Sequence, residues 1–453
     1  MKTTLFTSAL LLSSATAAPT PGLISSVLGA LSAATVSQIS STTTALNELL
    51  SAVGVSLATN ANSHGSVFQF TFPHVVPAAS KVPHTITWPT SFVNWKTYKA
   101  NGANMGNWLE IEQSLDTAWW AANVAPYPDE WTWCKNVGFS VCGPILEKKY
   151  SSFFTTADID TMASAGINTL RIPTTYQAWI NKPDSWLYHG SQQVYLRKIT
   201  DYAISKYNMH VIVGLHSLPG GINSLQIGEA FGHDGWFQNA TNLAYSFQAV
   251  DAIAAFIATS GHVSSFTVAP LNEASDNFAG FATAAGLTTA GTNWIVTYIN
   301  GVRKRLNLVS SQIPIMLQDS FLGASYWSPL FDSSANMVID THIYYFAASG
   351  IYSQYVAPAI CGQAATAAVG SNFPVFVGEW SLQTLYNNTY AGRKQIFQTQ
   401  YYSWNKYLAG GSFWTYHMYG TDPVDGEGTQ KDYWSLETAI SLGFLKNITD
   451  SYC

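Results

Sequence analysis

From about residue 99 to the C-terminus, the chain repeats one pattern: a short apolar segment, a polar or glycine-rich loop, and a longer segment with helical spacing of apolar residues. Strands that alternate with helices predict a parallel sheet, because each helix connects one strand to the next parallel strand. Eight strands over roughly 350 residues predict an α/β fold, the closed (β/α)8 TIM barrel with loop insertions and an N-terminal extension. The predicted strands are 103–108, 169–172, 211–215, 266–269, 313–317, 337–339, 375–377 and 412–414.

Five of the segments between these strands have clear helical periodicity. Helices are predicted over 157–165, with Thr156 as the N-cap, and over 192–206, 244–260, 292–306 and 393–408. A doubly wound open sheet is the alternative for the same alternation. Its phosphate-binding Gly-x-Gly-x-x-Gly turn is absent from the sequence, so closure into a barrel is favoured.

The N-terminal part of the chain differs in composition from the rest. Residues 1–18 predict a secretory signal peptide, because a lysine precedes a short apolar stretch and small residues place the cleavage near Ala17 or Ala18. Residues 19–88 are expected to form a Ser/Thr/Ala-rich extension or propeptide. Residues 89–453 are expected to form the barrel domain.

Two further features fit a secreted protein, extracellular or associated with a cell wall. Acceptor sequons for N-glycosylation begin at Asn239, Asn387 and Asn447. The four cysteines are even in number, so an oxidising compartment would allow two disulfides in three possible pairings. One of these pairings joins Cys134 to Cys142 and Cys361 to Cys453. A zinc site is the alternative, but no Cys-x-x-Cys pair is present.

Charge and aromatic content narrow the class of partner. The net charge is −6 and no long basic run occurs, which argues against nucleic acid. No later apolar run is long enough to span a membrane. Aromatic residues make up 14% of the chain and charged residues only 10%. This excess of rings indicates either a large aromatic core or a groove in which rings stack on sugar faces.

Polar side chains recur where the predicted strands end, which is where a TIM barrel carries its active site. Any one of them has an ordinary structural explanation, such as a histidine that only satisfies a hydrogen bond. Glutamates at the ends of strands four and seven are different, because burying two carboxylates on one face of a fold is costly. The candidates are Glu112, Arg171, His216, Asn272, Glu273, His342, Tyr344, Glu379 and Trp414.

Two carboxylates that face each other across a barrel mouth are suited to cleaving a glycosidic bond. We predict that Glu379 is the nucleophile, kept ionised by Arg171 and Tyr344, and that burial raises the pKa of the acid, Glu273. At the ends of strands four and seven, the two carboxylates should lie about 5–5.5 Å apart, the spacing of retaining enzymes.

Several strand-end segments resemble glycoside hydrolase family 5, in particular its fungal exo-β-1,3-glucanase group. They are GANMGNWLEIE, INTLRIP, LHSLPGG, LNEAS, VGEWS and FWTYH, and the resemblance extends from about residue 99 to 453. It implies a β-glucan hydrolase with Glu273 as acid/base and Glu379 as nucleophile. It also implies that Asn272 holds the sugar 2-hydroxyl and that Glu112 binds a hydroxyl of the terminal glucose. Arg171, His216, His342, Tyr344 and Trp414 complete the family's catalytic and first-subsite set.

The sequence departs from that group at several positions. Asn107 replaces a usual glycine. Leu225 stands where the enzymes of that group tend to carry a phenylalanine of their entrance clamp, and Ala347 falls near the position of their second one. Segment 113–142 is also unlike theirs. The expected activity is glucan exo-β-1,3-glucosidase, with β-1,6-glucanase or another β-glucosidase as alternatives. The long loop 217–238 carries Phe231, Trp236 and Phe237, which we expect to close one end of the cleft and to give exo-action.

Other classes of function are less consistent with the sequence. A serine esterase would need a Gly-x-Ser-x-Gly elbow, which is absent. A metallohydrolase could use His216, His342 and His417, but no His-Glu-x-x-His motif occurs. A non-catalytic carbohydrate-binding protein of the cell wall is the remaining alternative. We expect no cofactor, no metal, a monomer, and a β-glucan or oligosaccharide as substrate.

Overall fold

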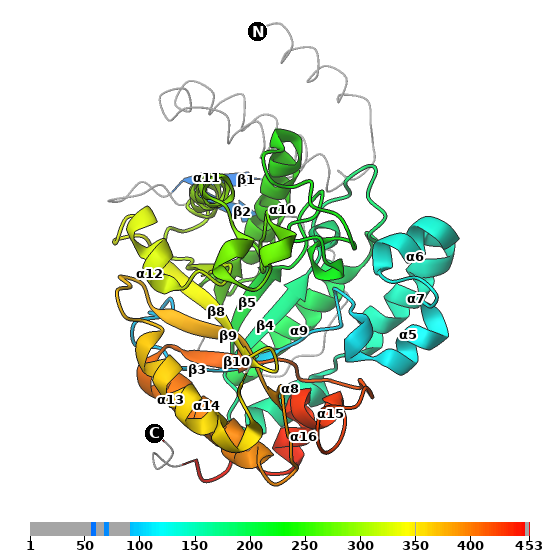
Figure 1. Cartoon of the computed structure of the whole chain (residues 1–453). Coiled ribbons are helices and arrows are strands. Elements are labelled where there is room, and N and C mark those ends of the chain that lie inside the picture. Colours follow the sequence, from blue (N-terminus) through cyan, green and yellow to red (C-terminus); the bar gives the residue numbers. More distant parts are fainter. Residues whose placement is uncertain (1–55, 60–67, 72–90, 349, 449–452) are drawn as a thin grey trace, which may run out of the picture. The chain divides into compact units, whose positions relative to one another are not determined.

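The computed structural model describes residues 56–59, 68–71, 91–348, 350–448 and 453 (Figure 1). The chain divides into two compact units, residues 1–81 and 82–453. In the first unit, β1 (Ser56–Thr59) pairs antiparallel with β2 (Phe68–Thr71). The predicted signal peptide and the predicted boundary at residue 88 lie outside the described residues.

The second unit contains a closed barrel of eight parallel strands, in the order β10-β3-β4-β5-β6-β7-β8-β9. The (β/α)8 prediction is therefore confirmed. The barrel closes between its first and last strands, where Gly410 pairs with Ala100 and Phe413 with Ala103. The strands are β3 (Ala100–Asn104), β4 (Thr169–Thr174), β5 (His210–Leu215), β6 (Phe266–Ala269), β7 (Ile315–Gln318), β8 (Met337–Tyr345), β9 (Val375–Thr384) and β10 (Gly410–Phe413).

The first and last strands begin earlier than the sequence predicts, because their pairing depends on glycines rather than on bulky apolar residues. A Cβ at Gly102 would lie 2.0 Å from Ser412 Oγ, so β3 and β10 approach closely only without a side chain there. Strands β8 and β9 are longer than predicted. Their polar residues continue the ladder, and His342 pairs in register with Glu379.

All five predicted helices are present: α8 (Thr156–Ser164), α9 (Gln192–Tyr207), α10 (Ala240–Ala258), α11 (Thr289–Leu306) and α14 (Arg393–Tyr407). The predicted N-cap at Thr156 is wrong by one residue. Thr155 is the N-cap and forms a capping box with Asp158, because the carboxylate reaches back to the Thr155 N–H at 2.7 Å.

Further helices were not predicted. Segment 113–142 leads into α5 (Thr117–Asn123), α6 (Glu130–Val137) and α7 (Phe139–Ser152), which lie together beside the barrel in Figure 1. The disulfide Cys134–Cys142 joins α6 to α7. Cys361–Cys453 joins α13 (Val356–Thr366) to the C-terminal residue. Several shorter helices lie between the main elements, among them α12 (Ala324–Trp327), α15 (Gln430–Trp434), α16 (Leu436–Ser441) and η3 (Gln226–Gly228).

The aromatic residues fall into two groups, those in the core and those that line a cavity. Six tryptophans are fully buried: Trp108, Trp120, Trp133, Trp236, Trp327 and Trp404. Other rings, including Trp414 and Trp434, line a cavity at the carboxyl ends of the strands. Within the described part of the chain, no helix combines the length and apolar character needed to cross a membrane.

Candidate active site

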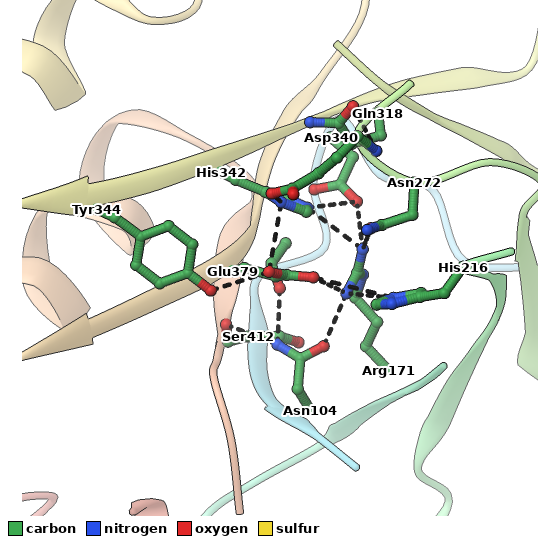
Figure 2. Close-up of polar contacts among 12 residues, drawn as sticks. Asn104, Arg171, His216, Asn272, Gln318, Asp340, His342, Tyr344, Glu379 and Ser412 are labelled. Atoms are coloured by element: carbon green, nitrogen blue, oxygen red, sulfur yellow. Dashed lines mark hydrogen bonds and ion pairs between the residues drawn. The ribbon is translucent and has the colours of Figure 1, made fainter. Parts of the chain in front are cut away.

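The structure brings the nine predicted site residues together. Eight of them line one cavity of about 680 Å³. The ninth, Arg171, is 1% exposed and contacts several of the others (Figure 2). The residues that line the cavity are Glu112, His216, Asn272, Glu273, His342, Tyr344, Glu379 and Trp414.

Arg171, on β4, connects the polar residues at the floor of this cavity. Its Nη1 donates to Glu379 Oε1 at 2.8 Å and to Asn104 Oδ1 at 3.0 Å. Its Nη2 donates to Asn272 Oδ1 at 2.9 Å and lies 3.3 Å from Asp340 Oδ2. A planar guanidinium holds such partners in fixed directions, so the floor is rigidly oriented before any substrate binds.

Both carboxylate oxygens of Glu379 are held by donors. Arg171 reaches Oε1, and the Tyr344 hydroxyl donates to Oε2 at 2.9 Å. Figure 2 shows Tyr344 and His216 on opposite sides of this carboxylate. Burial raises the pKa of Glu379, while the positive charges of His342 and Arg171 oppose the rise. Arg171 and Tyr344 do lower the pKa of Glu379, as expected, but burial raises it by more, so the pKa lies above its ordinary value.

Glu273 follows β6 and has a left-handed backbone, with φ at 47°. Its N–H donates to Gln318 Oε1 at 3.0 Å, and the Asn223 amide donates to its carbonyl at 3.1 Å. These bonds on both sides hold a conformation that a residue with a Cβ rarely adopts. The carboxylate of Glu273 is thereby directed into the cavity, where Oε1 lies 2.7 Å from His342 Nδ1.

His342 lies between the two glutamates. Its Nδ1 is 2.7 Å from Glu273 Oε1 and 3.4 Å from Glu379 Oε2. Although burial alone would lower its pKa, Glu379 and the contacts to Asp340 and Glu273 raise the pKa of His342 to about 10. His216 has the opposite shift, because burial and the charges of Arg171 and His342 hold its pKa well below the ordinary value. The floor thus pairs one charged and one neutral imidazole.

Glu273, His342 and Glu379 also present the atoms of a possible metal site, since one atom from each lies within 4.8 Å of the others. A metal ligand must be a neutral imidazole, whereas the raised pKa of His342 favours a proton on this ring. His417, the third histidine of the metallohydrolase alternative, does not line the cavity. Its ring contacts Glu437 at 3.1 Å and Asp158 at 3.6 Å.

The sequence-based reasoning missed Asp340, which is fully buried. Its Oδ2 lies 3.3 Å from Arg171 Nη2 and 3.7 Å from His342 Nε2. Asp340 precedes His342 by two residues on β8, so the two-residue period of a strand places both on the same face. That period was the available signal. Gly378, just before the nucleophile candidate, leaves room for this carboxylate: a Cβ there would lie 1.9 Å from Asp340 Oδ1.

Comparison with known proteins now decides the family. A family model described as Cellulase (glycosyl hydrolase family 5) matches residues 134–420. The chain belongs to glycosyl hydrolase family 5. It is therefore a glycoside hydrolase, and the resemblance to the fungal glucanase group is confirmed by the curated relatives.

These relatives include two fungal glucosidases. The probable glucan 1,3-beta-glucosidase A of Aspergillus niger is 29% identical over 299 residues, 64% of this chain and 67% of that protein. Glucan 1,3-beta-glucosidase 1 of Schizosaccharomyces pombe is 27% identical over 288 residues, 62% of this chain and 67% of that protein. Among solved structures, rutinosidase from Aspergillus niger has a TM-score of 0.77 and 45% identity, covering 79% of this chain and 100% of that one.

Two departures from the glucanase group of family 5 have structural explanations. Asn107 has φ at 58°, a left-handed conformation that asparagine tolerates nearly as well as the usual glycine. Its Oδ1 accepts the Glu112 N–H at 3.2 Å. Leu225 does not reach the cavity, and Ile227 from the same loop lines the wall in its place.

The rings expected to close the cleft of this family 5 enzyme do not line it, so that prediction is wrong. Trp236 is completely buried, because its indole N–H donates a hydrogen bond to Ser246 Oγ at 2.9 Å and its ring packs edge-on against Tyr298. Phe231 is 48% exposed, and its N–H donates to Asp129 Oδ2 at 3.0 Å. Phe237 packs against the core beside Trp236.

Proposed function

We propose that this protein is a retaining β-glucosidase that works by double displacement. The observation that carries the proposal is the separation of Glu273 and Glu379, since one oxygen of each lies within 4.8 Å of the other. Retaining enzymes hold their carboxyl groups about 5–5.5 Å apart, whereas inverting enzymes need about 6.5–9.5 Å to admit a water. The short separation leaves no room for that water and supports nucleophilic attack by the enzyme itself.

In the first step, Glu379 attacks the anomeric carbon while Glu273 donates its proton to the departing oxygen. A glycosyl ester to Glu379 forms and the bond to the leaving group breaks. In the second step, Glu273 takes a proton from water, which attacks the same carbon and releases Glu379. His342 Nδ1 lies 2.7 Å from Glu273 Oε1 and holds the carboxyl group of the acid/base residue in place during both steps.

Two side chains have polar atoms left free for the sugar. The Oδ1 of Asn272 is taken by Arg171, while its buried Nδ2 has no protein partner. The buried Oε1 of Glu112 likewise has none. These atoms support Asn272 as the donor to the 2-hydroxyl and Glu112 as the acceptor for another hydroxyl of the same glucose. Burial, together with the charges of Glu379 and Glu273, raises the pKa of Glu112 to about 8.

The proposed substrate is a β-glucoside whose glucose carries a second sugar, as in a β-rutinoside. The rutinosidase of Aspergillus niger is 45% identical over its whole length, against 29% over two thirds for the glucan 1,3-beta-glucosidase of the same organism. Glucan exo-β-1,3-glucosidase is the second candidate, supported by the names of the curated relatives.

Secretion is part of this proposal. Two disulfides suit an oxidising compartment, and the asparagines of all three sequons, Asn239, Asn387 and Asn447, are exposed as glycan attachment requires. The N-terminal 18 residues supply the expected export signal.

Proton NMR of the first-formed sugar tests the mechanism. A β-anomer at early times is the expected product, and an initial α-anomer would overturn the assignment of the two glutamates. Initial rates on p-nitrophenyl β-rutinoside, p-nitrophenyl β-glucoside, laminarin and pustulan test the substrate. We expect the rutinoside to be cleaved fastest. Higher kcat/KM on laminarin would favour the glucan exo-β-1,3-glucosidase instead.

A further inference from the structure

The two catalytic glutamates face different ends of the cavity. At one end, Phe321 follows a turn that is hydrogen-bonded to the same side chain as the Glu273 N–H. At the other end, Tyr344 donates to Glu379 Oε2, and its ring lies 5.1 Å from that of Trp434. Because a general acid must face the leaving group, the Phe321 end receives the leaving group and the Trp434 end faces the glycone. We call them the leaving-group end and the glycone end.

The shared side chain is that of Gln318, the last residue of β7. It is fully buried and does not line the cavity, so a substrate in the cavity does not touch it. Its Oε1 accepts the Glu273 N–H at 3.0 Å and the Ser320 N–H at 2.9 Å. An amide oxygen has two lone pairs, so these two donors use this atom fully. Figure 2 shows Gln318 at the edge of the polar floor, far from Tyr344.

The two N–H groups on this oxygen belong to backbone segments with an unusual conformation. Glu273, Ser320 and Phe321 all have left-handed backbones, with φ at 47°, 49° and 61°. Residues with a Cβ rarely adopt this region, and they keep it only where surrounding contacts hold them. The Ser320 bond lies within the turn and fixes the Gln318 side chain. The Glu273 bond joins this turn to the segment that follows the neighbouring strand, β6.

The direction of the Glu273 carboxyl group depends on that second bond. The bond fixes the peptide plane before Glu273, and rotation about φ from this plane sets where the side chain points. His342 Nδ1 lies 2.7 Å from Glu273 Oε1, which fixes the position of one oxygen and not the orientation of the backbone. A general acid must reach the leaving oxygen at hydrogen-bond distance, and a misplacement of about 1 Å can cost about 100-fold in rate.

We propose that Gln318 is a positioning residue for the acid/base, which it ties to the wall of the leaving-group end. Gln318 acts through Glu273, so its loss should impair protonation of the leaving group and leave attack by Glu379 intact. Substrates whose leaving groups need little protonation should therefore be spared. The proposal rests on the acid/base role of Glu273 given above.

The test measures kcat/KM, which reports the first step, for phenyl β-glucoside and 2,4-dinitrophenyl β-glucoside. Gln318→Met removes the acceptor while nearly keeping the length of the side chain. It should lower kcat/KM about 10- to 100-fold for the phenyl glucoside and less than about threefold for the dinitrophenyl glucoside. The ratio of the two values, measured on one enzyme sample, does not depend on the fraction of the protein that is folded.

Further variants separate the acceptor oxygen from a general loss of structure. Gln318→Glu keeps an acceptor oxygen at the same position and should restore most of the rate on the phenyl glucoside. Gln318→Asn withdraws the oxygen by one methylene and should have an intermediate effect, and it replaces the methionine variant if that variant does not fold. Gln398→Met is the matched control, because Gln398 is a buried glutamine outside the cavity whose Nε2 donates to the Phe444 carbonyl at 2.9 Å. This control should lower Tm and leave the ratio of the two kcat/KM values at the wild-type level.

The outcomes that would overturn the proposal are distinct from those that would overturn the function. Equal losses on both substrates by Gln318→Met would contradict the positioning role, because a general loss of structure does not discriminate between leaving groups. A Gln318→Glu variant as selective as Gln318→Met would contradict the role of the acceptor oxygen. Glu273→Ala is measured alongside, and if it shows no difference between the two substrates, the acid/base role of Glu273 itself is wrong.

Discussion

The floor of the cavity and its two ends are built in opposite ways. At the floor, the single side chain of Arg171 contacts four buried polar residues: Asn104, Asn272, Asp340 and Glu379. Toward the ends, rings and aliphatic side chains line the walls together with separate polar side chains. Charges that must stabilise a transition state are most effective when they are fixed in advance, whereas recognition of a particular sugar or leaving group depends on shape. We therefore expect the floor to carry out the chemistry and the ends to set the preference for substrate.

Changes at the floor should therefore reduce kcat by orders of magnitude, while changes at the ends should alter selectivity between substrates by smaller factors.

The largest effect is expected for Glu379→Gln, which removes the nucleophile and should lower kcat by about 10⁴-fold or more. Rates on p-nitrophenyl β-glucoside measure it. Glu427→Gln, an exposed position, is the control and should have wild-type rates. Near-normal turnover by Glu379→Gln would show that the covalent step lies elsewhere.

Glu273→Ala should lower turnover by about 10²- to 10⁴-fold on substrates with poor leaving groups. The loss should be much smaller on 2,4-dinitrophenyl β-glucoside, because this leaving group needs little protonation. Azide should restore deglycosylation and give the β-glycosyl azide, identified by NMR. An α-glycosyl azide from this variant would mean that the roles of Glu273 and Glu379 are exchanged.

Glu112→Gln tests a group at the border between the floor and the glycone end. An amide in place of this carboxyl group leaves a buried sugar hydroxyl without its proper partner, which costs about 1–3 kcal/mol, so kcat/KM for the glucoside should fall about 10- to 100-fold. The same change should stabilise the folded protein at alkaline pH. The pKa of Glu112 is raised to about 8, so its carboxyl group favours folding only while it is protonated.

The sign of this pH effect follows from linkage. Between the unfolded pKa near 4.5 and about pH 8, the folded state binds more protons than the unfolded state, so stability falls as pH rises. Denaturant unfolding should show Glu112→Gln gaining on the wild type progressively from pH 5 to pH 8. A difference that stays constant over this range would contradict the raised pKa.

The smallest effect is expected at the leaving-group end. Phe281→Ala removes a ring from the wall beside Phe321 without touching the floor. KM for aryl glucosides should rise about three- to tenfold with kcat nearly constant, because an aromatic contact contributes about 0.5–1.5 kcal/mol. The fluoride glycoside, which has no ring to stack, is the control and should be cleaved with unchanged KM. A large loss of kcat would mean that this end takes part in the chemistry.

The same contrast explains what the sequence predicts well. Arg171, His216, Glu273 and Glu379 follow directly from strands whose ends can be located, and the barrel then brings those ends together. Asp340 belongs to no motif of its own, and only the two-residue period of its strand connects it to His342. The residues of the floor can therefore be predicted from local strand patterns together with the closure of the strands into a barrel.

The ends were harder to predict for a physical reason. Trp236 was expected at the cleft, but its position depends on contacts with Ser246 and Tyr298. These partners lie on two helices outside its loop, and nothing in the loop sequence indicates that they will be its neighbours. Gln430 and Trp434 come from a short helix beyond the last strand, in a region without a recognisable motif. Loop conformations are set by partners distant in sequence, and those partners are known only once the fold is known.

Gly378 and Asp340 together have a consequence for how this sequence can change. Because a Cβ at 378 would overlap the Asp340 carboxylate, alanine at 378 is tolerated only with a smaller residue at 340. The two positions are therefore epistatic. A mutational scan of single variants should find both sites intolerant, whereas the double variant Gly378→Ala with Asp340→Gly should fold more stably than Gly378→Ala alone.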